Sequence, residues 1–154
     1  MGEYMNDVFI RLDETYLQEV KSLYKRAFGW VPWEDDWSDD AQLEEYILEV
    51  SGGRNSLNYG LLRDGKLIAV SLGSICHWWE GTNYNIEELC VDPDIQRQGI
   101  GSNFMELIEK DIKALGLAGI FLQTDEDKPS YGFYIKNGYN LLGKHVSFYK
   151  SVKE

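Results

Sequence analysis

The chain has 154 residues, of which 44% are hydrophobic and 14% aromatic, and its formal net charge at pH 7 is −11. This size and composition predict a single globular domain over residues 1–154 and exclude a disordered chain. Without a basic stripe, so acidic a protein is not expected to bind nucleic acid. No apolar run approaches the roughly 20 residues that span a bilayer, and no secretory signal is recognised. We therefore expect a cytoplasmic protein with no membrane partner.

The predicted strands contain two cysteines and one histidine, which are residue types that often bind metals. Cys76 and Cys90 lie in apolar stretches, which favours buried thiols, and His77 alone does not complete a ligand set. We therefore expect no metal site.

The first half of the predicted fold begins with one strand and two helices. Alternation indicates a short strand at residues 8–12, and apolar residues at helical spacing indicate a helix at residues 15–28. Residues 30–40 form a loop with three tryptophans and a proline, and a second helix follows at residues 41–50.

Three strands are expected next. Two of them, at residues 57–63 and 66–79, flank the pair Asp64-Gly65, which is a strong signal for a two-residue hairpin turn. A second turn leads into the third strand, at residues 84–91.

The remaining pattern predicts a helix at residues 104–115, a strand at 119–124, a helix at 130–137 and a closing hairpin at 139–150. The whole order is β-α-α-β-β-β-α-β-α-β-β. Such an order is typical of one mixed α/β sheet covered by helices.

The stretch "VDPDIQRQGIGSNF", residues 91–104, joins a predicted strand to a predicted helix. A helix N-terminus has unpaired N–H groups and partial positive charge, so it favours phosphate. Gly99 and Gly101 let an anion approach the backbone. A dinucleotide fingerprint would need a glycine where Phe104 stands, and a Walker loop would need a lysine after Gly101. These residues predict a pyrophosphate cradle of another kind.

Two segments resemble the GCN5-related N-acetyltransferase (GNAT) superfamily. "LCVDPDIQRQGIGSNFM" is similar to its acetyl-CoA-binding motif, with Gln96, Gly99 and Gly101 at the defining positions. "SYGFYIKNGY" resembles a second family segment, with Ser130 replacing Ala and Tyr139 replacing Phe. The resemblance covers roughly residues 57–142 and implies the GNAT fold and acetyl-CoA as cofactor. The branch considered for the chain is that of the aminoglycoside 6′-N-acetyltransferases.

The resemblance implies which residues contact coenzyme A. Backbone N–H groups at the end of the strand would face the acetyl carbonyl, and loop amides would hold the pyrophosphate. The expected contacts are Leu89, Cys90, Val91, Gln96, Arg97, Gln98, Gly99, Ile100, Gly101, Ser102 and Tyr134.

Proton transfer needs an acid and a base. Tyr134 matches the family tyrosine beside the thioester sulfur, where its phenol could protonate the leaving thiolate; by itself it could equally be a packing residue. For the base we favour Glu87, which by strand alternation shares a face with Leu89 and Asn85. Glu88 and a water relay are the alternatives.

The acceptor is expected beside the loop between the first two helices. Trp30, Trp33 and Trp37 offer aromatic faces there, and Glu34, Asp35 and Asp36 offer negative charge. Together these suit a cationic amine. The tryptophans could instead pack against the helices, and the acids could simply be a solvated helix N-terminus.

The sequence therefore predicts an acetyl-CoA-dependent N-acetyltransferase acting on a primary amine of a small cationic acceptor, such as an aminoglycoside or a polyamine. Two alternatives are a protein N-terminal or lysine acetyltransferase and, from another class, a non-catalytic acyl-CoA-binding module. A homodimer is one possible assembly.

Overall fold

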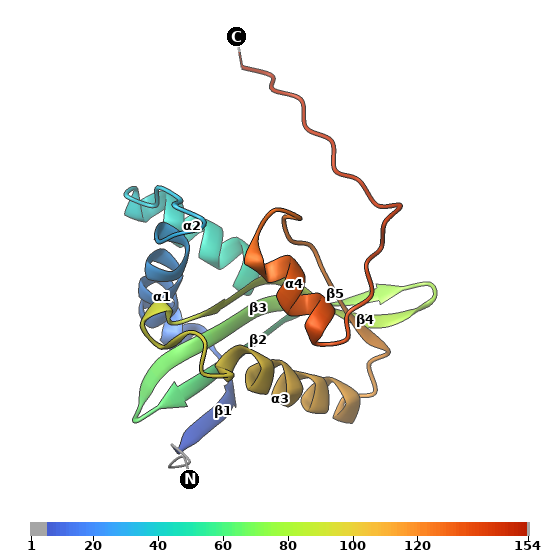
Figure 1. The fold of residues 1–154 in the computed structure, drawn as a ribbon, viewed down its shortest axis with the longest axis horizontal. Coiled ribbons are helices and arrows are strands. Elements are labelled where there is room, and N and C mark those ends of the chain that lie inside the picture. The colour runs from blue at the N-terminus through green and yellow to red at the C-terminus, as the bar shows by residue number, and fades with distance from the viewer. Residues whose placement is uncertain (1–5, 154) are drawn as a thin grey trace. The chain divides into compact units, whose positions relative to one another are not determined.

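The computed structural model describes residues 6–153. It divides into two compact units, Met1–Gln123 and Thr124–Glu154, which are described separately. The first unit holds a five-stranded sheet in the order β1-β2-β3-β4-β5 (Figure 1). Its strands are β1 (Asp7–Arg11), β2 (Ser56–Arg63), β3 (Lys66–Trp78), β4 (Gly81–Val91) and β5 (Gly119–Leu122).

Neighbouring strands are antiparallel except for β4 and β5, which are parallel. The turn between β2 and β3 uses Asp64 and Gly65, both with positive φ, as a two-residue hairpin turn requires. This confirms the turn that the sequence predicted. The parallel pair is joined through α3 (Ile100–Ala114), because parallel strands need a long crossover.

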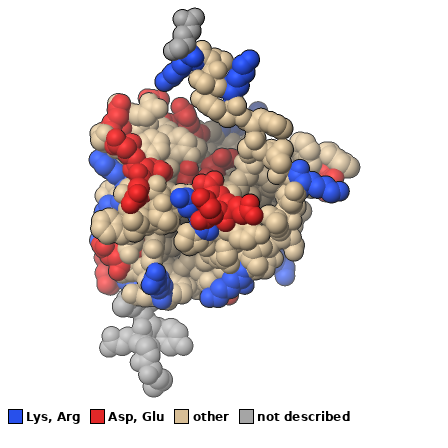
Figure 2. Space-filling view, turned by 45° about the horizontal axis from the view of Figure 1, so that its top comes forward, with Lys and Arg blue, Asp and Glu red and all other residues tan. Residues whose placement is uncertain are grey.

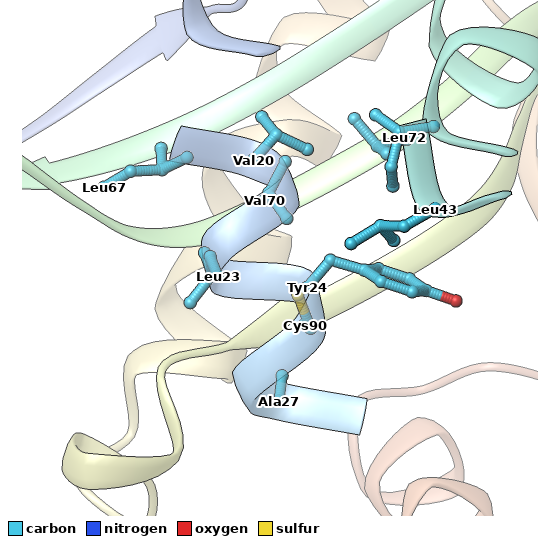
Figure 3. Packing of buried hydrophobic residues seen from close by; sticks show 10 residues of the cluster. Val20, Leu23, Tyr24, Ala27, Leu43, Leu67, Val70, Leu72 and Cys90 are labelled. Carbon is cyan, nitrogen blue, oxygen red and sulfur yellow. The ribbon is translucent and has the colours of Figure 1, made fainter. Parts of the chain in front are cut away.

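One face of the sheet is covered by α1 (Leu17–Gly29) and α2 (Asp40–Ser51). Figure 3 shows the core on this face, where helix side chains such as Leu23 and Leu43 pack with Val70, Leu72 and Cys90 of the sheet. The two helices are also tied by the buried Lys21, whose Nζ lies 3.0 Å from a carboxylate oxygen of Asp40.

Helix α3 packs on the opposite face. The ring of Phe104, which is fully buried, packs against Phe9 in a T-shaped arrangement, and Phe9 stacks on Tyr59. The hydroxyl of Tyr59 donates to Asp111 of α3 at 2.7 Å. The sheet is therefore sandwiched between helices, as the predicted mixed α/β class requires.

The second unit contains α4 (Pro129–Lys136), which confirms the predicted short helix. The closing hairpin predicted at residues 139–150 is wrong, because the structure has no strand between residues 139 and 153. Its large apolar side chains are exposed; Phe148, for example, is 94% exposed. Alternation makes a segment suitable for a strand, but a strand forms only with a partner to complete its hydrogen bonds, and no strand lies within this unit.

Two smaller expectations concern the cysteines and membrane-spanning helices. Cys90 is buried in the core as predicted, whereas Cys76 is only half-buried. None of the helices within residues 6–153 combines the length and the apolar character needed to cross a membrane.

Candidate active site

The predicted cofactor loop lies between two firmly held points. At its start, Asp92 is buried directly after β4 and leads into a short 3-10 helix, Pro93–Ile95. At its end, α3 begins at Ile100, which is buried. Residues 96–99 between them are exposed.

The loop backbone has the form expected of an anion site. Arg97 and Gly99 adopt positive φ angles of 70° and 74°, and Gly99 caps the N-terminus of α3. Turns that alternate in this way form concave nests of N–H groups, and the first N–H groups of a helix lack partners inside the helix. The loop can therefore present several backbone donors to a phosphate.

The end of β4 leaves one strand edge without a strand partner. Pairing with β5 ends at Ile86 opposite Leu122, whereas β4 continues to Val91. Along Leu89, Cys90 and Val91, the described residues supply a strand neighbour only on the β3 side. Strand N–H groups on the other side are placed to donate to a ligand.

A β-bulge separates the two candidate bases. Ile86 pairs with Gly73 and Glu88 with Leu72, so Glu87 has no partner in β3. Gly73 is needed at this point because a Cβ there would collide with the carbonyl oxygen of Asn85. The bulge interrupts the alternation along β4. Consequently, the expectation that Glu87 and Asn85 share a face does not follow from simple alternation.

Glu88, not Glu87, is held inside a cluster of side chains. Its Oε1 accepts hydrogen bonds from the phenol of Tyr46 on α2 and, at 3.3 Å, from the phenol of Tyr24 on α1. Glu87 is exposed. The structure thus brings together one β4 carboxylate and two helix tyrosines that sequence reasoning did not select. A tyrosine at a core position of a predicted helix needs a partner for its hydroxyl, and this requirement is the sequence signal that could have pointed to Tyr24 and Tyr46.

Burial dominates the electrostatics of this cluster. Desolvation raises the pKa of the Glu88 carboxyl above its usual range, although the hydrogen bonds from Tyr46 and Tyr24 oppose this effect. Desolvation also raises the pKa of both phenols, and Glu88 adds to the increase. Both tyrosines therefore remain neutral donors at physiological pH, and Glu88 binds a proton more readily than an exposed glutamate does.

The three predicted tryptophans have different environments. Trp37 packs against the tyrosines of the cluster, with ring centroids 5.5 Å from Tyr46 and 5.6 Å from Tyr24. Trp33 packs edge-on against Phe28, whereas Trp30 is 65% exposed. Packing against other aromatic rings therefore explains Trp33 and Trp37, whereas Trp30 exposes an aromatic face to solvent.

The acidic residues of the same loop, Glu34, Asp35 and Asp36, are exposed. Asp36 accepts from the N–H of Ser38, and Asp39 caps α2 by accepting from the N–H of Gln42. Helix capping thus occupies part of the acidic stretch, as one of the two interpretations expected. Acidic side chains gather in groups on the face seen in Figure 2.

Tyr134 belongs to the second unit. It lies on α4, where its ring packs edge-on against Phe133 and Tyr139 at centroid distances of 5.2 and 5.5 Å. Its role in catalysis stays a prediction.

A model of the acetyltransferase (GNAT) family matches residues 17–139. The match covers most of the chain and extends through both compact units, so the protein belongs to this family. The predicted fold, the enzyme class and the use of acetyl-CoA are thereby confirmed.

Several known proteins are similar to the chain. The alanine N-acetyltransferase of ribosomal protein bS18 from Escherichia coli K12 is 28% identical over 142 residues, which are 92% of this chain and 86% of the relative. An aminoglycoside acetyltransferase, meta-AAC0020, from an uncultured soil metagenomic sample, solved with sisomicin, has a TM-score of 0.74 at 21% identity and covers 96% of this chain and 97% of its own. Aminoglycoside N-acetyltransferase AAC(6′)-Iy, solved with CoA, has a TM-score of 0.71 at 19% identity and covers 99% of both chains. At these identities the two structures support the fold alone.

The environment of Glu88 predicts a characteristic pH dependence of stability. Because its pKa is raised on folding, its stabilising contribution is complete below about pH 4.3, the ordinary value for glutamate, and is lost as the pH rises through the folded-state pKa. Glu88→Gln removes this titration. We predict that the variant gains free energy of unfolding relative to the native protein as the pH rises through that window, as measured by urea unfolding across pH.

Glu87→Gln, which neutralises the adjacent exposed carboxylate, controls for a general charge effect. Parallel stability curves for the native protein and Glu88→Gln would contradict the burial of an ionisable Glu88.

Proposed function

We propose that the enzyme transfers the acetyl group of acetyl-CoA to a primary amine of a small cationic acceptor, with Glu88 as the base. The observation that carries this proposal is the cluster of Glu88, Tyr24 and Tyr46 at the end of β4. It places a carboxylate of raised proton affinity on the strand that leads into the cofactor loop.

The loop has the features that a pyrophosphate requires. Its exposed backbone turns through two positive φ angles and ends at a helix N-terminus. We assign the pyrophosphate to the amides of Arg97 through Ser102, and the acetyl carbonyl to N–H groups within Leu89–Val91. When bound, acetyl-CoA supplies the activated acetyl group as a thioester.

Glu88 suits the task of a base for an amine. An alkylammonium group is protonated at neutral pH and must lose a proton before it can attack. A carboxylate whose pKa is raised by burial is a stronger base than an exposed one, and the two phenols fix its orientation. Glu87, which is exposed in the bulge, remains the alternative through a water relay. Tyr134 is assigned, from the family resemblance, to hold the proton for the departing thiolate.

The acceptor assignment rests on the loop between α1 and α2. Its exposed acids attract cations, and the exposed Trp30 offers a face for cation–π contact. Aminoglycosides and polyamines combine several ammonium groups with a primary amine. Because the chain shares its fold with aminoglycoside acetyltransferases, aminoglycosides are the first acceptors to test.

A second candidate acceptor is the N-terminal amine of a protein. It is favoured by the relative that acetylates the alanine of ribosomal protein bS18, which aligns with 92% of this chain. A peptide with an N-terminal alanine is therefore the appropriate competitor in any panel of amines.

One prediction of the proposed function concerns Gly99 in the cofactor loop. A valine there would be strained at φ 74° and would add a branched side chain to the phosphate loop. We predict that Gly99→Val weakens acetyl-CoA binding more than about tenfold, or roughly 1.4 kcal/mol, in calorimetric titrations.

Gly65→Val is the matched control, because Gly65 has a φ of 75° in the β2–β3 turn and lies outside the loop. It should cost stability but keep the affinity for acetyl-CoA. Equal affinities in the two variants would remove the loop from the cofactor site.

Another prediction of the proposed function concerns the acidic loop. We predict that Glu34→Gln combined with Asp35→Asn raises the Michaelis constants of polycationic amines and changes the rate at saturation less. The constants of the native enzyme should also rise as salt increases from about 0.02 to 0.5 M, because screening weakens the attraction. Thiol release from acetyl-CoA measures both effects.

Glu106→Gln combined with Glu109→Gln removes the same charge from α3, on the opposite face of the sheet, and controls for net charge. Preference for the alanine peptide, with no dependence on salt, would favour the protein acceptor and refute the cationic small molecule.

A further inference from the structure

Asp92 is a buried carboxylate that lies outside the proposed chemistry. The residue is only 2% exposed and stands between the last residue of β4 and the 3-10 helix Pro93–Ile95. Burying an ionised carboxylate is costly unless other groups pair with it and hydrogen-bond to it. Its partners therefore show what holds this part of the chain in place.

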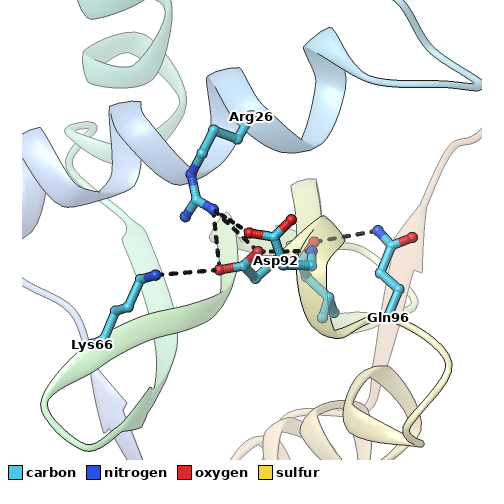
Figure 4. Close-up of polar contacts among 6 residues, drawn as sticks. Arg26, Lys66, Asp92 and Gln96 are labelled. Atoms are coloured by element: carbon cyan, nitrogen blue, oxygen red, sulfur yellow. Dashed lines mark hydrogen bonds and ion pairs between the residues drawn. The ribbon is translucent and has the colours of Figure 1, made fainter.

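Figure 4 shows that these partners come from three different elements. Arg26 of α1 donates from Nη1 to both carboxylate oxygens, at 3.1 and 3.2 Å. The N–H of Asp94 donates to the same carboxylate at 3.0 Å and thereby caps the 3-10 helix. Lys66 of β3 approaches to 4.0 Å.

The backbone of Asp92 is fixed as well. Its N–H donates to the carbonyl oxygen of Ile68 in β3 at 2.8 Å, and its own carbonyl oxygen accepts from the N–H of Ile95 at 3.1 Å. Asp92 thus joins β3, α1 and the first turn of the loop. Of the two groups that donate hydrogen bonds to its carboxylate within the described residues, Arg26 comes from a helix that covers the sheet, whereas the N–H of Asp94 belongs to the 3-10 helix itself.

This anchor sits directly before a strained segment. Arg97 is not a glycine, yet it adopts a positive φ, which costs free energy for a residue with a side chain. Such a conformation persists only when the surrounding structure imposes it. Downstream, the buried Ile100 and Phe104 fix the start of α3; upstream, the fixed point is Asp92. Loosening Asp92 would therefore let the exposed turn relax.

We infer that Arg26 is a positioning residue for the pyrophosphate loop, which acts through the buried Asp92 and touches no phosphate itself. This inference rests on the proposed cofactor cradle. It assigns α1 a part in cofactor binding, although the sequence motif for acetyl-CoA begins only at Leu89, near the end of β4. Tyr24 lies two residues earlier on the same helix and bonds to Glu88, so α1 holds both ends of the proposed site.

The first test needs no ligand. In hydrogen–deuterium exchange of the free protein, we predict that Arg26→Gln speeds exchange of the hydrogen-bonded amides of Asp92, Asp94 and Ile95 by about tenfold, because a hydrogen-bonded buried pair is broken. Arg26→Lys, which keeps the positive charge and a donor nitrogen, should restore part of the protection. Arg63→Gln is the matched control, because it breaks the ion pair of Arg63 with Asp7 on β1, away from the loop.

The second test uses calorimetry with coenzyme A. Arg26→Gln should weaken binding by about tenfold, Arg26→Lys by less, and Arg63→Gln not at all. Asp92→Asn separates positioning from direct contact. If Arg26 acts through Asp92, this variant also weakens binding, and combining it with Arg26→Gln adds little further loss. If Arg26 instead binds phosphate, freeing it from Asp92 leaves the affinity unchanged or raises it.

Unchanged exchange in Arg26→Gln, or retained affinity in Asp92→Asn, would overturn the inference. If Asp92→Asn does not fold, the exchange and affinity of the two Arg26 variants decide the question. Gly99→Val tests the proposed pyrophosphate cradle independently of the positioning role of Arg26. Weak binding in Gly99→Val with native binding in Arg26→Gln refutes only the positioning role, whereas native binding in both refutes the cradle.

Discussion

The attachment of α1 to the end of β4 is the constraint on which the proposed site depends. Two carboxylates of this region, Glu88 and Asp92, each accept a hydrogen bond from α1, through Tyr24 and Arg26 respectively. Between them, Cys90 is buried in the core that α1 and α2 share with the sheet. Apolar packing supplies most of the free energy that holds α1 against the sheet. The two polar contacts fix the position of α1 along β4.

In the proposed site, β4 carries both the backbone N–H groups for the acetyl carbonyl and the carboxylate that acts as the base. The end of β4 has an edge free of strand pairing in the described structure, where N–H groups can meet a carbonyl oxygen, and it continues into a loop suited to phosphate. The side chain of Glu88 faces the tyrosines of α1 and α2 at the same level. An acyl donor along the edge and an amine beside the helices would then meet near the bulge. Trp37 and Trp33 of the acidic loop pack against aromatic side chains of the helices, whereas Trp30 and the acids of the loop are exposed and are the groups proposed to meet the acceptor.

The parts of this picture that depend on local pattern were accessible from the sequence. The glycines of the loop, the Asp64-Gly65 turn and the order of the first nine elements each follow from residues close together in the chain. The choice between Glu87 and Glu88 was not accessible in this way, because a bulge opposite Gly73 alters the alternation on which the argument relied. Similarly, the partners of Glu88 and Asp92 come from helices distant in the sequence, and only the tertiary fold brings them together. The segment predicted as a closing hairpin has the alternation of a strand. Alternation in one segment does not show whether another strand is there to pair with it.

The most direct test of the proposed site is backbone amide NMR of the protein titrated with acetyl-CoA and, separately, with acetylpantetheine, which lacks the pyrophosphate. If the loop holds the pyrophosphate and β4 the acetyl group, acetyl-CoA should shift the amides of residues 97–102 and 89–91 most among those of the first unit. Acetylpantetheine should then shift only the β4 group. Unchanged loop amides at saturating acetyl-CoA, with the largest shifts elsewhere on the sheet, would contradict this assignment of the cofactor site.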